Sequence, residues 1–298
     1  MKDIIIDYLS LHRDRTILRE MDEVVDWNIS AHPLANLVDI AQSGAFVARH
    51  QEINVGMVYA FPYEGNIGWI GFLVVKPSYQ KRGIGTALMN KAIDFLRQKK
   101  LSSIGLYATE EGISLYQKLG FFKILTSWRF TIEGVEELEK LKSKLKVASS
   151  SSEIVDFSQV NHILFDEIVS LDAEIFGANR RLIFEKRLEM GSWHCTCVLK
   201  GHNLDAFGMW RLIDNHFGFI GPVMGSKTSV FGVLLPRIFL ELIALSASTL
   251  YLGTDSSELA SWLASLGFKT GERPLLMFLG ALKPLNSQMW VICHPAKG

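Results

Sequence analysis

The fold of this chain is decided by the stretch Phe72-Leu73-Val74-Val75-Lys76-Pro77-Ser78-Tyr79-Gln80-Lys81-Arg82-Gly83-Ile84-Gly85-Thr86. Its apolar, β-branched beginning predicts a buried strand that stops at Pro77. A polar loop with two closely spaced glycines follows, and apolar residues at helical spacing then predict a helix from Ile84 to Lys99. Because glycine has no Cβ, the loop can turn its backbone N–H groups inward. The stretch therefore predicts a strand–loop–helix unit that faces a ligand.

The start of this helix is a candidate phosphate site. Its first turn offers unpaired N–H groups and the positive end of the helix dipole, which together suit a pyrophosphate. We therefore expect phosphates to be bound by Gln80, Lys81, Arg82, Gly83, Ile84, Gly85 and Thr86, with the two basic residues at the rim. The spacing is neither the Walker pattern nor the three-glycine dinucleotide fingerprint. Taken alone, the paired glycines would also fit a tight strand–helix turn without a ligand.

Strand and helix patterns alternate on both sides of this stretch. In the first half, strands are expected at 4–9, 44–49, 54–62, 68–75, 103–108 and 121–130, with helices at 13–27, 34–42, 84–99 and 112–119. The second half repeats this order weakly: Trp69-Ile70-Gly71 and Leu119-Gly120-Phe121 have counterparts in Phe219-Ile220-Gly221 and Leu266-Gly267-Phe268, at spacings that differ by about three residues. Both halves are therefore expected to share one α/β fold, a mixed sheet with helices on both faces.

The domain boundary is expected near the middle of the chain. Ser149-Ser150-Ser151-Ser152 has the composition of a flexible linker. The charged run Glu133–Lys146 before it predicts a solvated helix, with partner docking as the alternative. We expect a first domain at 1–132, a linker at 133–152 and a second domain at 153–298.

Two motifs resemble those of the GNAT (Gcn5-related N-acetyltransferase) family. The first is the apolar strand that ends in Val75-Lys76-Pro77 and is followed by Gln80-x-x-Gly83-x-Gly85. The second is Tyr107-Ala108-Thr109, Gly112 and then Leu115-Tyr116-Gln117-Lys118-Leu119-Gly120-Phe121. Together they extend from about Gly68 to Phe121. The resemblance implies two tandem GNAT-like domains, each a mixed, mostly antiparallel twisted sheet, and acetyl-CoA as the co-substrate.

The resemblance also implies roles for individual residues. Backbone N–H groups of Leu73–Val75 would receive the pantetheine and polarise the thioester carbonyl, and Thr109 and Gly112 would belong to the cofactor site. Tyr116 resembles the general acid that protonates the leaving thiolate, although it also fits a packed helix tyrosine. Asp26-Trp27-Asn28 would line the acceptor pocket.

No residue stands out as the general base. The strand from Ile67 to Val75 carries no acid, unlike that of many family members. Glu23, Asp26 and Glu64 are the candidate carboxylates, and each also fits a solvated surface charge. A weakly basic acceptor amine needs only water.

The second half lacks the chemistry of the first. Gly221-Pro222-Val223 is followed by Met224-Gly225-Ser226-Lys227 without a Gln-x-x-Gly-x-Gly, and Leu263 stands where the first half has Tyr116. Phe176-Gly177-Ala178-Asn179-Arg180 resembles a bacterial subgroup in which an active GNAT domain precedes a degenerate one. That resemblance implies that the second half walls the acceptor site or forms a packing surface, with a regulatory pocket as the alternative.

Composition excludes several other classes of protein. The 298 residues carry no formal net charge, which argues against duplex nucleic acid as a partner. The apolar stretch Phe231–Leu250 contains Pro236, Arg237 and Glu241, so it predicts a buried helix rather than a membrane span. Three cysteines are too few for a disulfide framework, and His194-Cys195-Thr196-Cys197 has no second cluster to complete a metal site.

The sequence therefore predicts a cytoplasmic N-acetyltransferase, a monomer or homodimer, that moves an acetyl group from acetyl-CoA to a primary amine of a small molecule or peptide. This interpretation requires no metal, nucleic acid or membrane. The alternative is a non-catalytic acetyl-CoA-binding module that senses the cofactor or binds a partner. Tyr116 favours the enzyme, because a binding module needs no proton donor at that position.

Overall fold

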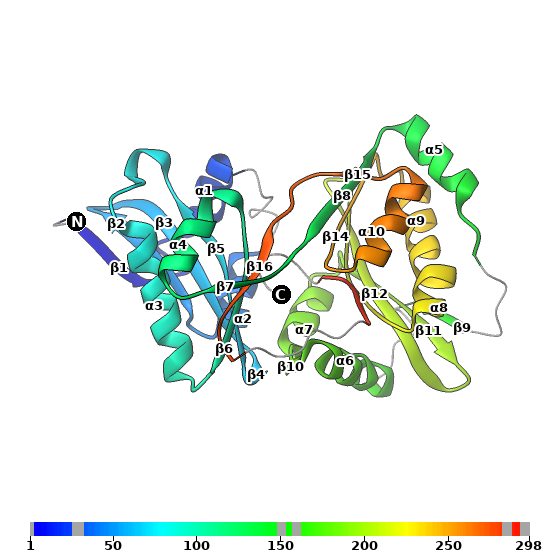
Figure 1. The fold of residues 1–298 in the computed structure, drawn as a ribbon, viewed down its shortest axis with the longest axis horizontal. Helices are drawn as coiled ribbons and strands as arrows, with labels where there is room; N and C mark the ends of the chain where they lie inside the picture. The colour runs from blue at the N-terminus through cyan, green and yellow to red at the C-terminus, as the bar shows by residue number, and fades with distance from the viewer. Residues whose placement is uncertain (1–2, 26–32, 148–152, 157–161, 282–287, 293–298) are drawn as a thin grey trace. The chain divides into compact units, whose positions relative to one another are not determined.

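The computed structural model describes residues 3–25, 33–147, 153–156, 162–281 and 288–292 (Figure 1). Contacts divide the chain into two compact units, each built from separated stretches of sequence. The described residues of the first unit lie within Met1–Ile124 and Leu276–Leu282. The second comprises Leu125–Leu275 and Lys283–His294.

A mixed sheet forms the centre of the first unit. In the described part of the chain, its seven strands follow the order β1-β2-β3-β5-β6-β16-β7. In that order they span Ile4–Tyr8, Ala45–His50, Ile53–Pro62, Ile67–Val75, Ser103–Ala108, Leu275–Gly280 and Phe122–Thr126, and the short strand β4 spans Glu64–Gly65. Strands β1, β2, β3 and β5 pair antiparallel, whereas β5 and β6 are parallel. The predicted mixed, mostly antiparallel sheet is confirmed.

Helix α3 (Ile84–Gln98) packs directly on the backbone of this sheet. Leu88 lies against Gly56 of β3 and Leu96 against Gly68 of β5, where an added Cβ would come within 3.3 Å and 2.9 Å of the leucine side chains. The apolar spacing that predicted the helix is therefore its packing face. The unit also contains α1 (Ile17–Val25), α2 (Leu34–Ala41) and α4 (Ile113–Lys118), with 3-10 turns at Pro77–Tyr79 and Glu110–Gly112.

A second mixed sheet forms the centre of the other unit. Across the described residues its strand order is β15-β8-β14-β13-β12-β11-β9, and β17 pairs with β13 off this path. The strands are β8 (Trp128–Glu133), β9 (Glu153–Asp156), β11 (His194–Lys200), β12 (Asn203–Ile213), β13 (Phe217–Gly225), β14 (Thr249–Thr254), β15 (Lys269–Thr270) and β17 (Met289–Val291), and β10 is Ala178–Asn179. The helices are α5 (Val135–Lys144), α6 (His162–Phe176), α7 (Arg181–Glu189), α8 (Lys227–Ser229), α9 (Leu235–Ala244) and α10 (Ser257–Leu266), with a π-helical turn at Val230–Leu234.

Each sheet is completed by a strand from the other half of the sequence. Strand β16, orange in Figure 1, lies between β6 and β7 of the first sheet although it follows α10 in the chain. Strand β8 joins the second sheet, where Trp128 pairs with Thr254 and Glu133 with Thr249 of β14. The structure thus differs from the predicted boundary after 132. It also divides the single strand expected at 121–130 into β7 and β8, on either side of Ser127.

The charged run assigned to the linker belongs to the second unit. It forms α5, which buries Leu138 and Leu141 in the core of that unit. Its opposite side carries exposed ion pairs, with Lys140 Nζ at 2.8 Å from Glu136 and 2.9 Å from Glu137. The helix expected here is present, but one side of it packs in the core, whereas the sequence predicted a solvated helix in a linker.

The apolar stretch at 231–250 forms the end of the π-helical turn, α9 and the start of β14. Ile238, Phe239 and Leu242 of α9 are fully buried in the core of the second unit. Within the described residues, no helix has the length and apolar character needed to cross a membrane.

Candidate active site

A β-bulge interrupts β5 in the middle of the first sheet. Tyr59 of β3 pairs with Gly71, but Met57 pairs with Val74, so β5 holds one extra residue between these two pairs. Phe72 lies at the bulge and has a left-handed φ of 53°. A non-glycine residue in such a conformation costs about 1–3 kcal/mol and persists only where its surroundings impose it. Bulges of this kind redirect a strand and occur often beside active sites.

Aromatic packing holds Phe72 in this conformation. Its ring meets those of Tyr59 and Phe61 edge-on, with centroids 5.6 Å and 6.5 Å away, and only 2% of the residue is exposed. Edge-to-face pairs contribute about 0.5–1.5 kcal/mol each beyond burial, which is enough to offset the strain. The bulge is therefore fixed by the core of the unit.

Strand β5 leaves its parallel neighbour next to this bulge. Pairing with β6 runs from Ile67 opposite Ser103 to Trp69 opposite Gly105, and the register ends there. Among the described strands, β5 pairs with β3 and β6 alone. Toward β3, residues 73–75 follow the bulge in the antiparallel ladder, and on the other side no described strand pairs with them. We call that second side the open β5 edge. It contains Leu73, Val74 and Val75, the residues to which the sequence assigned the pantetheine and the thioester carbonyl.

The loop after β5 leads from this edge to α3. The Gln80 side chain donates a hydrogen bond to the Val75 carbonyl at 3.0 Å, which closes the base of the loop. Lys81 and Gly83 have left-handed φ values of 58° and 80°, so the chain reverses sharply on both sides of Arg82. Gly83 is the residue at which glycine is required, because it is the N-cap of α3 and holds this conformation without strain.

The first turn of α3 presents its amides beside the loop. The first helical hydrogen bond runs from the Ala87 N–H to the Gly83 carbonyl at 3.0 Å. The amides of Ile84, Gly85 and Thr86 precede that bond, as the unpaired donors of a helix start do. Together with the positive end of the helix dipole they suit a phosphate. The structure thus brings the predicted phosphate-binding residues together around one helix terminus.

Basic side chains lie at the rim of the loop. Lys81 and Arg82 are both exposed. The Arg82 guanidinium lies 5.1 Å from the centre of the Tyr79 ring, a cation–π contact that orients it. The Tyr79 hydroxyl is in turn 3.1 Å from His50 Nδ1. The rim therefore has positive charge where an anionic ligand would approach.

Tyr116 lies on α4, which packs beside the first turn of α3: a Cβ on Gly85 would come 3.5 Å from the side chain of the adjacent Leu115. The Tyr116 ring is almost fully buried and meets Phe121 edge-on at 6.0 Å. Burial raises the pKa of the Tyr116 phenol well above its ordinary value, so the hydroxyl keeps its proton at neutral pH. A protonated, poorly solvated phenol can act as a proton donor.

The structure shows why glycine occupies position 112. A Cβ on Gly112 would lie 2.6 Å from Tyr116 Cε2, so the glycine leaves room for the tyrosine ring, a contact that the sequence did not predict. The Gly112 N–H donates to the Thr109 carbonyl at 3.0 Å and begins the turn before α4. The predicted contacts of Thr109 and Gly112 with the cofactor stay a prediction.

The acceptor side of the site is only partly described. Asp26, Trp27 and Asn28 lie outside the described residues. Of the candidate bases, Glu23 on α1 and Glu64 on β4 are exposed. Strand β5 carries no acidic residue, so it places no carboxylate of its own at the open β5 edge. The general base is therefore not assigned.

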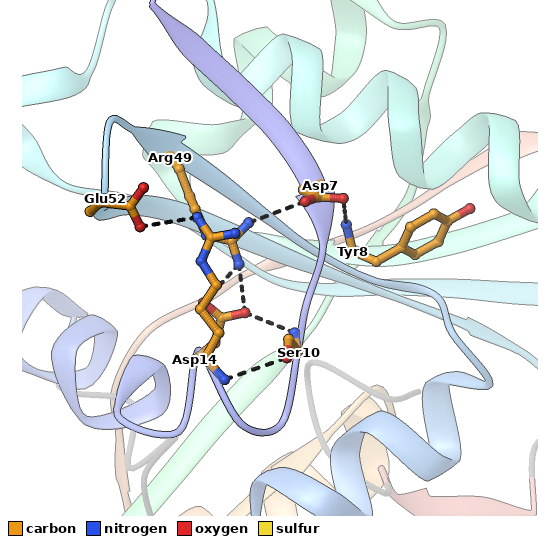
Figure 2. Close-up of polar contacts among 7 residues, drawn as sticks. Asp7, Tyr8, Ser10, Asp14, Arg49 and Glu52 are labelled. Carbon is orange, nitrogen blue, oxygen red and sulfur yellow. Dashed lines mark hydrogen bonds and ion pairs between the residues drawn. The ribbon is translucent and has the colours of Figure 1, made fainter.

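A buried ion pair, which the sequence did not predict, holds the start of α1 against the sheet. Figure 2 shows Arg49 of β2 directed at Asp14, which precedes α1. Arg49 Nη2 donates to the two Asp14 oxygens at 2.7 Å and 2.6 Å, and the Ser10 N–H donates to Oδ2 at 2.8 Å. Burial, and after it the Asp14 charge, raises the pKa of Tyr59 beside the bulge. Asp14 lies in the polar stretch from Ser10 to Thr16, which resembles a surface loop.

The second unit repeats the bulge but not the loop. Trp210 of β12 pairs with Ile220, whereas Gly208 pairs with Val223, so β13 has one extra residue at Gly221-Pro222. In the predicted repeat, Gly221-Pro222 corresponds to Gly71-Phe72, one residue before the Phe72-Leu73 bulge of β5. The two halves therefore share a bulge that is shifted by one residue. After β13 the chain enters α8 through the Ser226 hydroxyl, which accepts from the Ser229 N–H at 3.4 Å, without a glycine pair.

The run His194-Cys195-Thr196-Cys197 belongs to the packing of β11. His194 stacks on Trp210 at 4.2 Å, and the Trp210 Nε1–H donates to Thr196 Oγ1 at 3.1 Å. The sulfur atoms of Cys195 and Cys197 are buried and 4.0 Å apart. The described residues contain no group of three His, Cys, Asp or Glu side chains that could hold a metal ion.

Comparison with known proteins agrees with this geometry. The profile of the acetyltransferase (GNAT) family matches residues 12–121, and that of the acetyltransferase (GNAT) domain matches residues 168–290. The chain belongs to the GNAT family of acetyltransferases and carries two GNAT domains in tandem. It is therefore an acyltransferase enzyme.

Several proteins resemble the chain over most of its length. The uncharacterized N-acetyltransferase YitH of Bacillus subtilis (strain 168) is 22% identical over 238 residues, which cover 78% of each chain. The crystal structure of a Pyrococcus horikoshii protein that is described as "A Putative Acetyltransferase" matches with a TM-score of 0.76 and 19% identity, over 100% of this chain and 97% of that one. The structure of a tandem GNAT protein from the clavulanic acid biosynthesis pathway matches with a TM-score of 0.68 and 13% identity, over 94% of this chain and 99% of that one. At such identities the structural likeness shows the fold alone.

Proposed function

We propose that the protein transfers an acetyl group from acetyl-CoA to a primary amine of a small molecule or peptide, by direct attack of the amine. The observation that carries the proposal is the open β5 edge, which begins at the Phe72 bulge and leads into the glycine loop at the start of α3. GNAT acetyltransferases in general use acetyl-CoA and act on amines. Acetyl-CoA supplies the acetyl group as a thioester.

The residues of the loop fit a pyrophosphate. The left-handed Gly83 permits the turn into α3. The three amides that precede the first α3 hydrogen bond and the exposed Lys81 and Arg82 supply positive potential beside it. No acidic residue occurs between Val75 and Thr86 to oppose an anion. In this proposal Gln80, Lys81, Arg82, Gly83, Ile84, Gly85 and Thr86 hold the phosphates.

The open β5 edge fits the remaining arm of coenzyme A. Backbone groups of Leu73, Val74 and Val75 can bond an extended, amide-bearing ligand as a neighbouring strand would. An N–H of this edge can also donate to the thioester oxygen as negative charge develops there. Removing one such preorganised donor typically costs about 3 kcal/mol in transition-state stabilisation.

Tyr116 is the proposed proton donor to the departing thiolate. Its burial beside the first turn of α3 and its raised pKa keep the phenol protonated over the pH range in which amines lose their proton. An amine must be neutral to attack, so activity is expected to rise with pH up to about 9 without loss of the acid form of Tyr116.

The experiment is a thiol-release assay with acetyl-CoA over a panel of amines, which includes polyamines, amino acids, aromatic amines and peptides. For the best acceptor, Tyr116→Phe is expected to lower kcat by about 100-fold while the Kd for acetyl-CoA changes less than about twofold, because only a proton donor is removed. The matched control is Tyr251→Phe, which alters a partly buried tyrosine of raised pKa in the second unit.

Unchanged kcat in Tyr116→Phe would remove Tyr116 from the mechanism. Tight acetyl-CoA binding without thiol release for any amine would instead support a non-catalytic binding module.

A further inference from the structure

The second unit contains a counterpart of the open β5 edge. Strand β13 pairs in parallel with β14 from Phe217 opposite Thr249 to Ile220 opposite Leu252, and this pairing ends at the Gly221-Pro222 bulge. In the first unit, β5 likewise leaves β6 just before its bulge. In both GNAT domains the central strands therefore diverge just before a bulge, at positions that differ by one residue in the repeat.

The counterpart in the second unit is occupied by β17. On the β13 side, Val223 pairs with Val291 and Met224 with Met289. The Gly225 N–H donates to the Gln288 carbonyl at 3.2 Å, and the Gly225 carbonyl accepts from Trp290 Nε1 at 2.9 Å. The backbone and one side chain of β17 thus form hydrogen bonds with the part of β13 that corresponds to the open β5 edge.

The same strand also bonds to β14, across the divergence. The Ile292 N–H donates to the Gly253 carbonyl at 3.0 Å, and the Thr254 hydroxyl donates to the Trp290 carbonyl at 2.6 Å. A Cβ on Gly221 would lie 2.3 Å from the Ile292 carbonyl oxygen, so glycine at this bulge permits the close approach. Strand β17 therefore bridges the two diverging strands with hydrogen bonds on both of its edges.

The side chains of β17 are part of the core. Val291 is fully buried, Trp290 is 6% exposed, and both belong to the main hydrophobic cluster of the second unit. The Trp290 ring meets Phe231 edge-on with centroids 4.9 Å apart. Displacing β17 would expose this apolar surface and break the bonds on both edges, so a ligand would have to replace all of them.

We propose that β17 permanently occupies the gap between β13 and β14, which is the counterpart of the open β5 edge. A strand of the chain itself thus lies where a GNAT domain binds the pantetheine arm. The second unit is thereby closed to acyl-CoA, and the chain binds one equivalent, in the first unit. The inference rests on the proposed function for the location of that one site. It also explains why the second domain can lack a glycine loop and the counterpart of Tyr116 without leaving an empty groove.

The experiment combines stoichiometry with hydrogen exchange on the full chain, with acetyl-CoA as the probe. Calorimetry is expected to give one site, and Gly83→Glu is expected to abolish it. Amides of the peptide that covers 288–292 are expected to exchange as slowly as those of β13, with or without acetyl-CoA. In contrast, the peptide that covers 72–86 is expected to gain protection when acetyl-CoA binds.

A pair of tryptophan variants tests the role of β17 itself. Trp290→Phe removes the bond to the Gly225 carbonyl and is expected to speed exchange in 288–292 by about 5- to 30-fold, with the affinity for acetyl-CoA unchanged. The control is Trp262→Phe, whose ring also packs on Phe231, at 5.1 Å, from α10. It is expected to leave exchange in 288–292 within about twofold of the wild type.

The outcomes separate the two proposals. Two sites in the wild type, or faster exchange of 288–292 on addition of acetyl-CoA, would overturn the closure by β17. A single site that survives in Gly83→Glu, with 288–292 still protected, would refute the glycine loop as the binding place and leave the closure supported. No binding by the wild type, with 288–292 still protected, would refute the proposed function and leave the closure supported. Rapid exchange of 288–292 in the wild type would overturn the closure whatever the first unit binds.

Discussion

At the scale of single residues, the buried ion pair between Asp14 and Arg49 stabilises the part of the first unit next to the β5 bulge. Both side chains are buried, and the pair anchors the segment before α1 beside Tyr59 and the bulge. Arg49→Met would leave the Asp14 charge buried without its partner. Breaking a buried pair on one side typically costs about 3–5 kcal/mol. We expect a loss of that size in the free energy of unfolding, measured by urea denaturation.

The control for this prediction is Arg13→Met. Arg13 pairs with Glu52 at 3.4 Å, but the two side chains are 46% and 90% exposed, so a loss below about 1 kcal/mol is expected. The double variant Asp14→Leu with Arg49→Met removes both charges and is expected to recover most of the stability. A double variant as unstable as Arg49→Met would show that the ion pair is not the cause.

At the scale of the elements, the sequence predicted best what depends on local signals. The strand at 68–75 and the helix at 84–99 follow from apolar periodicity and from Pro77 and Gly83, and the structure confirms both. The Phe72 bulge could not be predicted, because phenylalanine does not favour a left-handed backbone. The rings of Tyr59 and Phe61, supplied by another strand, impose it.

Strands that depend on distant partners were predicted poorly. The apolar run of β16 fits a strand, but its place between β6 and β7 is set by pairing with residues more than a hundred positions earlier. The same applies to β17 and to β8, which was expected to continue β7 in the first domain. The motif residues proposed for the site could be selected from the sequence because their spacing is local. Asp14 and Arg49 are 35 residues apart, and nothing in the sequence indicated their contact.

At the scale of the whole molecule, the exchange of strands makes each unit depend on both halves of the sequence. A fragment of residues 1–126, which ends with β7, lacks β16. This leaves β6 and β7 without their shared neighbour and Trp69 without Phe278, whose ring lies 6.1 Å away. Because unpaired strand edges promote association, we expect this fragment to aggregate and to show no cooperative unfolding transition. Size-exclusion chromatography and thermal denaturation followed by circular dichroism measure both properties.

The matched control for the fragment carries residues 274–282 after a flexible glycine–serine linker. Restoring β16 is expected to return a monomeric species with a cooperative transition. A fragment of 1–126 that unfolds as cooperatively as the repaired one would show that β16 is dispensable for the first unit.

The proposed function depends on the binding of coenzyme A by the glycine loop, residues 80–86. Calorimetric titration with acetyl-CoA tests this binding most directly. Gly83→Glu places bulk and negative charge among the amides at the start of α3, so heat of binding is expected to disappear. The control Gly201→Glu makes the same change at another left-handed glycine, φ 65°, with open space around it, and is expected to bind as the wild type does. A folded Gly83→Glu protein with wild-type affinity would contradict the account.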